Sequence, residues 1–184
     1  MTAYTGLVTL VQLSACVLGD KNKMSYDAGI SYIRNVLEAT RTLQKNPDDL
    51  DARGIIMLGA SLSTSSRIGI GKEEPFAYDI YELEFLPEKL FGSTYRRSLT
   101  SIFPRFLAAM GRHHAAEVEK YCRDAFGFGS SIEESSRKLI ELFSGFGAEM
   151  YFDGKITREQ VDSIPCRTEL TPNEVFELMN SLIR

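Results

Sequence analysis

The side chains that most often bind metals or act as nucleophiles are few in this sequence and widely spaced. The two histidines, His113 and His114, are adjacent. Neighbouring residues of a helix point about 100° apart, so these two cannot chelate one ion without a bend, and we expect them at a helix end or on the surface. The cysteines Cys16, Cys122 and Cys166 lack the spacing of a metal knuckle and indicate reduced thiols in a cytoplasmic protein.

Three other stretches have residues of catalytic types without the pattern that catalysis needs. Gly69–Lys72 lacks the earlier glycine and the following Ser or Thr of a phosphate-binding loop. The hydroxyl-rich stretch Ser61–Ser66 has no nearby histidine to activate a nucleophile. The acidic pairs Glu73–Glu74 and Glu82/Glu84 are typical of solvated surfaces. None of these stretches predicts a site.

Length and composition indicate an ordinary globular protein. The chain has 184 residues, 43% hydrophobic content and a formal net charge of −4. This charge gives no reason to expect nucleic acid or an anionic membrane as partner. No apolar run approaches the roughly 18–20 residues needed to cross a bilayer.

Apolar periodicity and capping signals predict helices along nearly the whole chain. We expect a buried first helix over Thr5–Leu18 and a second one after the turn Gly19–Asn22. The segment Asn46–Asp49 predicts the start of a third helix, with Asn46 as N-cap and Pro47 in the first helical position.

Further helices are expected in the second half of the chain. Their apolar spacing places them at Pro75–Leu86, Thr94–Ala109 and His114–Ala125. Three capping boxes predict later helix starts, at Ser131–Glu134, Thr157–Gln160 and Thr171–Glu174. Because strand signals are almost absent, this order of elements predicts one compact all-α domain over residues 1–184.

One segment carries a resemblance to a known family. Asn46–Arg53 reads N-P-D-D-L-D-A-R and is followed by Ile56-Met57. It resembles a helix start in the C-terminal domain of the iron-containing (group III) alcohol dehydrogenases, in the NAD(P)-dependent butanol dehydrogenase branch. Thr5–Val8, Leu90–Gly92 and the tail Thr168–Arg184 resemble the same domain more weakly. The resemblance implies a multi-helix, dehydroquinate synthase-like fold.

The resemblance also implies an activity and a cofactor. Members of the family have an N-terminal α/β domain that binds the nicotinamide cofactor, and a helical domain that supplies one Asp and three His to a divalent iron or zinc ion. The metal polarises the substrate oxygen while hydride is transferred. Met1 falls where the two domains would join, and no strand is followed by a glycine-rich turn. We therefore expect no nucleotide-binding domain within residues 1–184.

The resemblance places the first two metal donors four residues apart on one helical face, at Thr9 and Leu13. Leucine cannot coordinate a metal, and neutral threonine is a poor ligand for iron or zinc. The fourth donor position falls on Tyr95, where the glycine that follows in the family is replaced by Arg96.

The third donor position depends on the register of the alignment. Counting forward from Asn46 places it at Asp79, and counting back from Pro104 places it at Tyr81. Neither residue is a histidine. We therefore expect a degenerate site with no catalytic, cofactor-binding or metal-binding residues, and no cofactor for this chain.

Our first hypothesis for function is a non-catalytic, metal-free domain with an interaction or oligomerisation role. A former interdomain cleft would leave a partly exposed apolar face, lined by Thr9, Leu13, Tyr81, Phe85 and Tyr95. Such a face usually binds a partner. The candidates are a second copy of the chain, a separate nucleotide-binding chain, or a small ligand.

The alternative hypothesis is an enzyme component, the helical subunit of a split NAD(P)-dependent alcohol dehydrogenase. Asp79, Tyr81 or Tyr95 would then perform metal-free acid–base catalysis. Arg96 and Arg97 adjoin Tyr95 and would have to lower the pKa of its phenol.

Overall fold

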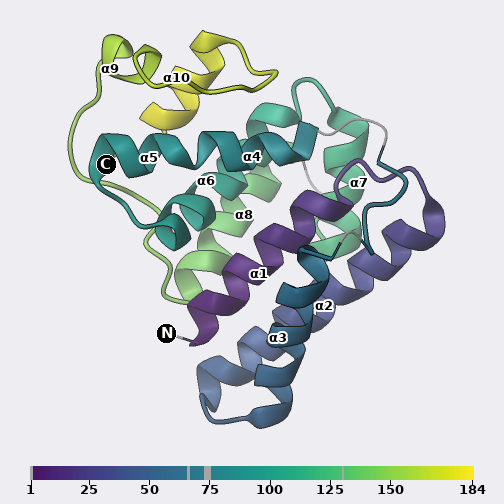
Figure 1. The fold of residues 1–184 in the computed structure, drawn as a ribbon. Coiled ribbons are helices and arrows are strands. Elements are labelled where there is room, and N and C mark those ends of the chain that lie inside the picture. The colour runs from purple at the N-terminus through teal and green to yellow at the C-terminus, as the bar shows by residue number, and fades with distance from the viewer. Residues whose placement is uncertain (1, 66, 73–75, 130) are drawn as a thin grey trace.

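The computed structural model describes residues 2–65, 67–72, 76–129 and 131–184, and it confirms the all-α fold (Figure 1). Within these ranges there is no strand, and extended pairing is limited to two isolated bridges, Asp20–Lys72 and Phe152–Ile183. The elements in chain order are α1 (Thr2–Val17), α2 (Lys23–Lys45), α3 (Leu50–Ser63), the 3-10 helix η1 (Phe76–Tyr78), α4 (Asp79–Leu83), α5 (Phe85–Phe91), α6 (Tyr95–Met110), α7 (Ala115–Phe126), α8 (Ile132–Gly145), α9 (Arg158–Asp162) and α10 (Pro172–Asn180).

Helix α1 lies at the centre of the structure and is apolar on nearly all sides. It packs against α2, α3, η1 and α6, and Figure 1 shows it crossing the middle of the molecule. Its fully buried apolar side chains are those of Leu7, Leu10, Val11, Leu13 and Val17. A helix of this kind is stable in water only when other elements cover it. No helix in the described ranges is both long and apolar enough to span a bilayer.

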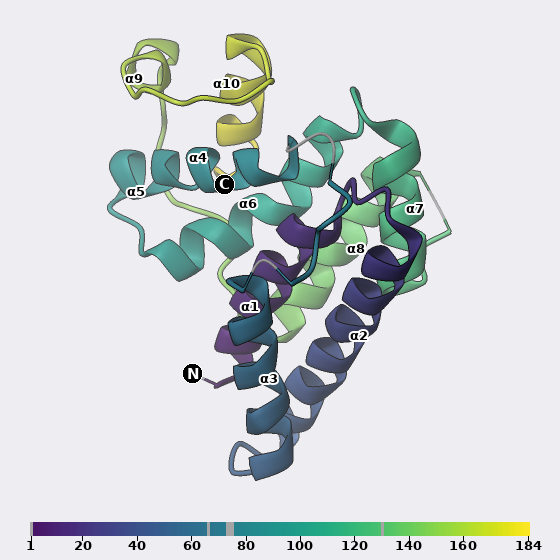
Figure 2. The same ribbon diagram turned by 45° about the vertical axis from the view of Figure 1, so that its right-hand side comes forward.

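Helices α2 and α3 form an antiparallel hairpin against α1 (Figure 2). Two glycines let the three helices come close. A Cβ atom added to Gly29 of α2 would lie 2.2 Å from Val17 Cγ2, and one added to Gly59 of α3 would lie 2.8 Å from Val36 Cγ2. Both distances are too short for real carbon atoms, so the packing requires glycine at these positions.

The start of α3 differs from the prediction. Asn46 ends α2, with its backbone N–H donating to Thr42 O, and the N-cap of α3 is Asp49, whose side chain accepts from Ala52 N at 2.9 Å. The prediction that Asn46 caps this helix and that Pro47 begins it was therefore wrong. Pro47 has no N–H with which to continue α2, so a short turn separates the two helices.

The helix predicted over Pro75–Leu86 is divided in the structure. Pro75 lies outside the described residues, and η1, α4 and α5 follow one another, with Glu84 between α4 and α5. Pro87 has no N–H to donate to the carbonyl of Leu83, which explains an interruption at this point. Helix α5 continues to Phe91, beyond the predicted end.

The predicted helices near α6 and α7 are confirmed, as are two of the three capping boxes. At Thr157 and Thr171 the side chain of the third helical residue returns a hydrogen bond to the N-cap backbone. At Ser131 only half of the box forms, because Glu134 binds Arg137 at 2.6 Å instead.

Two glycine substitutions test the packing of the hairpin. Gly29→Ala forces a methyl group against Val17, and we expect it to lower the free energy of unfolding by about 1–3 kcal/mol. Gly54→Ala is the matched control, because an added Cβ there meets nothing within 4 Å on a helix that solvent reaches. It should stabilise the chain by roughly 0.5–1 kcal/mol. Urea denaturation followed by circular dichroism measures both effects, and equal shifts would contradict the close approach.

Candidate functional site

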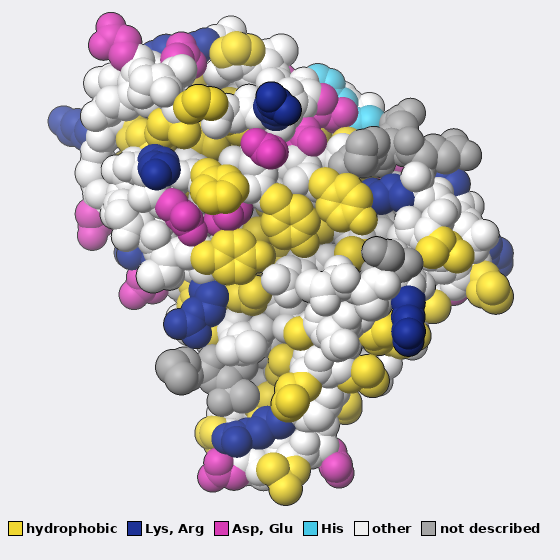
Figure 3. Space-filling view, in the orientation of Figure 1, with side chains coloured by type: hydrophobic (Ala, Val, Ile, Leu, Met, Phe, Trp, Pro, Cys, Tyr) yellow, Lys and Arg dark blue, Asp and Glu magenta, His cyan; other side chains and the backbone are white. Residues whose placement is uncertain are grey.

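Aromatic side chains from three short elements gather beside α1. Figure 3 shows hydrophobic side chains grouped between α4–α5 and α1, with acidic side chains next to them. The rings of Tyr78 and Tyr81 are stacked, with centroids 6.3 Å apart. Tyr95, at the start of α6, accepts a hydrogen bond from Gln12 Nε2 of α1 at 3.3 Å. We call Tyr78, Tyr81, Phe85 and Tyr95 the aromatic face.

The helical geometry of η1, α4 and α5 explains why three of these rings share one side. Tyr78, Tyr81 and Phe85 are three and four residues apart, and the backbone between them stays close to helical. Phe85 is 50% exposed, Tyr78 39% and Tyr95 37%. Large aromatic side chains therefore meet solvent at this surface.

Thr9 and Leu13 do not line the exposed surface, contrary to expectation. They are 2% and 0% exposed. A Cβ atom added to Gly59 would lie 3.1 Å from Thr9 Cγ2 and 3.5 Å from Leu13 Cδ1. Helix α3 thus covers both residues, and a sequence pattern could not show which side of α1 it would cover.

Asp79 and Tyr81, the alternatives for the third donor position, have different surroundings. Asp79 Oδ2 accepts hydrogen bonds from Thr168 Oγ1 and from the backbone N–H of Glu169, both at 2.8 Å. These contacts tie Asp79 to the segment before α10. Tyr81 instead lies close enough to Tyr95 for a charge on one phenol to raise the pKa of the other. The structure brings Tyr81 and Tyr95 together and leaves Asp79 outside their surroundings.

The tyrosines of the aromatic face are neutral at physiological pH. Burial is the main cause that raises the pKa of Tyr78, of Tyr81 and of Tyr95. The nearby carboxyl of Glu84 raises the pKa of Tyr95 further. Neutral phenols can donate hydrogen bonds, but they are poor metal ligands and poor general bases.

Arg97, one of the two arginines proposed to support Tyr95, has other partners. Arg97 Nε lies 3.0 Å from the Glu149 carboxylate, and Arg97 Nη2 donates to Tyr151 O at 2.7 Å. With the pKa of Tyr95 raised rather than lowered, acid–base catalysis by this residue has no electrostatic support.

Lys72, the last residue of the Gly69–Lys72 stretch for which no site was predicted, lies beside the aromatic face. Lys72 Nζ donates to Ala15 O and lies 3.8 Å from the centroid of the Tyr78 ring. Burial lowers the pKa of Lys72 to about 8. The neighbouring Cys16 thiol donates to Ser63 O at 3.3 Å, and burial raises its pKa. The contacts among Lys72, Cys16 and Tyr78 could not be predicted from the sequence, because they form only when the segment that contains Lys72 folds back onto the end of α1.

Glu84 was expected on a solvated surface, and that prediction was wrong. Glu84 is only 3% exposed, because its position at the junction of α4 and α5 turns the side chain inward. Its Oε2 atom has no hydrogen-bond partner among the described residues. Burial, with a smaller contribution from Glu88, raises the pKa of Glu84 to about 8.

The two histidines lie at the turn between α6 and α7, as expected, and they contact the C-terminal part of the chain. His113 Nε2 lies 2.9 Å from Glu174, and His114 Nε2 lies 2.6 Å from Glu169. The ring of His114 also stacks on Phe76, with centroids 3.9 Å apart. Both histidines are thus engaged in contacts to other elements.

No protein-family model and no curated protein sequence matches the chain. Solved structures do match it. The NADH-dependent butanol dehydrogenase A of Thermotoga maritima aligns over 100% of this chain and 52% of its own, with a TM-score of 0.82 and 17% identity. An iron-containing alcohol dehydrogenase of Corynebacterium glutamicum aligns over the same shares, with a TM-score of 0.66 and 16% identity.

The YqhD protein of Escherichia coli, described in another structure as an aldehyde reductase, aligns over 82% of this chain and 40% of its own, with a TM-score of 0.72 and 14% identity. These matches confirm the fold that the sequence resemblance predicted, that of the helical C-terminal domain of iron-containing alcohol dehydrogenases. The whole chain aligns with the Thermotoga and Corynebacterium proteins, but it spans only about half of their length.

The residues present do not fit the divalent metal that this fold implies. Thr9 and Leu13 are buried under α3, and the phenols of Tyr81 and Tyr95 are held neutral. In the described part of the chain no three His, Cys, Asp or Glu side chains lie close enough together to hold an ion.

Glu84 should make the stability of the chain depend on pH. Its pKa rises from 4.5 to about 8 on folding, so between these values the folded state keeps a proton that the unfolded state has lost. The free energy of unfolding should therefore fall as pH rises from about 5 to about 8, and Glu84→Gln should flatten this slope. Thermal melts across this range test it, with Glu82→Gln, at an exposed position of α4, as control. Parallel profiles for Glu84→Gln and the unmodified chain would contradict the assignment.

Proposed function

We propose that this chain is a metal-free member of the iron-containing alcohol dehydrogenase family that acts in protein–protein association rather than in catalysis. The observation that carries the proposal is the aromatic face, where exposed rings occupy the region to which the resemblance assigns the metal site. Phe85, Tyr78 and Tyr95 are each more than a third exposed. Contiguous apolar surface of this kind is usually covered by a partner.

The chemistry of the donor positions supports this proposal. An ion such as iron or zinc is usually bound by several carboxylate, imidazole or thiolate ligands, and Thr9, Leu13, Tyr81 and Tyr95 supply none of these. Asp79, the alternative for the third position, would be a single carboxylate, and it already accepts hydrogen bonds from Thr168 and Glu169. The tyrosine rings fill space that metal-binding side chains would otherwise take, and aromatic rings fill such space efficiently. We place the protein in the cytoplasm, on the basis of its reduced thiols and its fold.

The partner that we propose first is a second copy of the chain. Rings with few rotatable bonds lose little conformational entropy on binding, so they suit the centre of an interface. Neighbouring carboxylates such as Glu88 would lie at the rim, where they can stay hydrated.

A second candidate function is the helical part of an NAD(P)-dependent oxidoreductase. The extent of the match favours it, because the chain corresponds to about half of a butanol dehydrogenase described as NADH-dependent. In that case a nucleotide-binding domain on another chain would cover the aromatic face. Lys72, with a pKa of about 8, is the group beside that face best able to exchange a proton near neutral pH.

Metal titration tests whether the chain is metal-free. We expect metal-stripped protein, titrated anaerobically with Fe(II) and separately with Zn(II) in a calorimeter, to show no saturable heat. Saturation at one ion per chain with a Kd of roughly 1 μM or tighter would contradict the metal-free proposal and favour the oxidoreductase.

Sedimentation velocity over a concentration series tests self-association. Phe85→Ser should weaken the dimer roughly tenfold or more, because it removes an aromatic ring from the proposed interface. Met24→Ser is the matched control, since Met24 is also an exposed apolar residue, 78% accessible at the start of α2. A chain that stays monomeric at high concentration, or equal effects of both variants, would contradict association through this face.

A further inference from the structure

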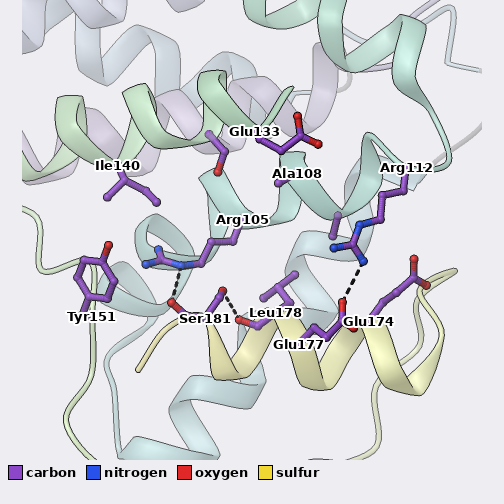
Figure 4. A pocket seen from close by; sticks show the side chains of 12 residues that line it. Arg105, Ala108, Arg112, Glu133, Ile140, Tyr151, Glu174, Glu177, Leu178 and Ser181 are labelled. Atoms are coloured by element: carbon purple, nitrogen blue, oxygen red, sulfur yellow. Dashed lines mark hydrogen bonds and ion pairs between the residues drawn. The ribbon is translucent and has the colours of Figure 1, made fainter. Parts of the chain in front are cut away.

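A cavity of about 320 Å³ lies between α6, α8 and α10, and it is separate from the aromatic face. Figure 4 shows Arg105 extending from α6 across this cavity toward Tyr151 and the end of α10. The volume is at the lower end of the range for pockets that bind small organic molecules.

Arg105 is the most unusual residue of this cavity, because it is a charged group that is only 7% exposed. Its Nε donates to Ser181 O at 3.1 Å, and its Nη1 donates to Ser101 O at 2.8 Å. The guanidinium also lies 4.7 Å from the centroid of the Tyr151 ring. All of these partners are neutral, and in the described ranges no carboxylate pairs with Arg105. Buried arginines normally pair with an anion, because a lone buried charge is costly.

The remaining lining offers one more hydrogen-bond donor and an apolar wall. Ser136 of α8 is 7% exposed, and it lines the cavity. Ala108, Ile140 and Leu178 form apolar lining from α6, α8 and α10 respectively. The cavity thus combines a cationic donor and a serine hydroxyl with a hydrocarbon surface.

Three carboxylates at the edge of the cavity restrict the kind of anion that fits. Glu177 is paired with Arg112 at 3.0 Å, and Glu174 is held by its capping box and by His113. Glu133 is exposed on the first turn of α8. Their negative charges repel multiply charged ligands more strongly than singly charged ones.

From this geometry we infer that the cavity binds a small monocarboxylic acid with an apolar chain. The ligand carboxylate accepts hydrogen bonds from the Arg105 guanidinium and the Ser136 hydroxyl, and supplies the missing counter-charge. The hydrocarbon chain lies along Ala108, Ile140 and Leu178. This site is separate from the aromatic face and does not depend on the function proposed for it.

Calorimetric titration with butyrate and hexanoate, in a buffer free of carboxylates, tests the site. We expect saturable binding of one acid per chain with a Kd of roughly 0.1–1 mM, tighter for hexanoate, and no binding of hexanol. Arg105→Gln should weaken binding roughly tenfold or more, and Ser136→Ala should weaken it less. Arg41→Gln is the matched control, because Arg41 is an exposed arginine of α2 that pairs with Glu38 and does not line the cavity.

A second variant keeps the test decisive if Arg105→Gln fails to fold. Ile140→Phe fills part of the cavity and leaves Arg105 in place, so it should abolish hexanoate binding without loss of helical content. Absence of saturable heat with both acids would overturn the inference, as would equal binding of hexanol. Inorganic phosphate binding more tightly than the acids would overturn the ligand class.

Discussion

The rest of the structure depends on covering helix α1. Its leucines and valines point to all sides, so the helix cannot lie at a surface, and α2, α3, η1 and α6 pack around it. Close approach of the hairpin is possible because Gly29 and Gly59 have no side chains at the contacts with neighbouring helices. The same packing determines which side chains of α1 reach the aromatic face. Helix α3 covers Thr9 and Leu13, and the side that carries Gln12 faces Tyr95.

The aromatic face follows from this arrangement, and its electrostatics favour binding over chemistry. Burial raises the pKa of its tyrosines, so their hydroxyls remain neutral donors and do not become phenolates. Exposed rings at such a surface form a suitable interface core, because they bury much apolar area for little loss of conformational freedom.

Helix α6 links the two surfaces that could have a function. Its first residue, Tyr95, belongs to the aromatic face, and Arg105, three turns later, enters the cavity against α8 and α10. The two surfaces differ in chemistry, since one is aromatic with adjacent carboxylates and the other surrounds a buried cation. Burial of Glu84 beside Tyr95 shows that the chain keeps ionisable groups in unfavourable surroundings at more than one place. Strongly perturbed groups of this kind are common where proteins bind ligands or partners.

The all-α fold and most helix positions could be predicted from the sequence, because apolar spacing, caps and prolines act over a few residues. The segment Asn46–Arg53 also indicated the right fold, although the helix there begins at Leu50 instead of Pro47. The residue types at Thr9, Leu13, Asp79 or Tyr81, and Tyr95 predicted a loss of metal binding, and this stays a prediction. Only the tertiary structure decided that α3 buries Thr9 and Leu13, that Asp79 turns toward Thr168, and that Glu84 points inward. It also placed Arg105 in a cavity where no carboxylate of the described residues pairs with it. These outcomes depend on contacts between residues far apart in the chain, and local patterns do not encode which faces of two helices will meet.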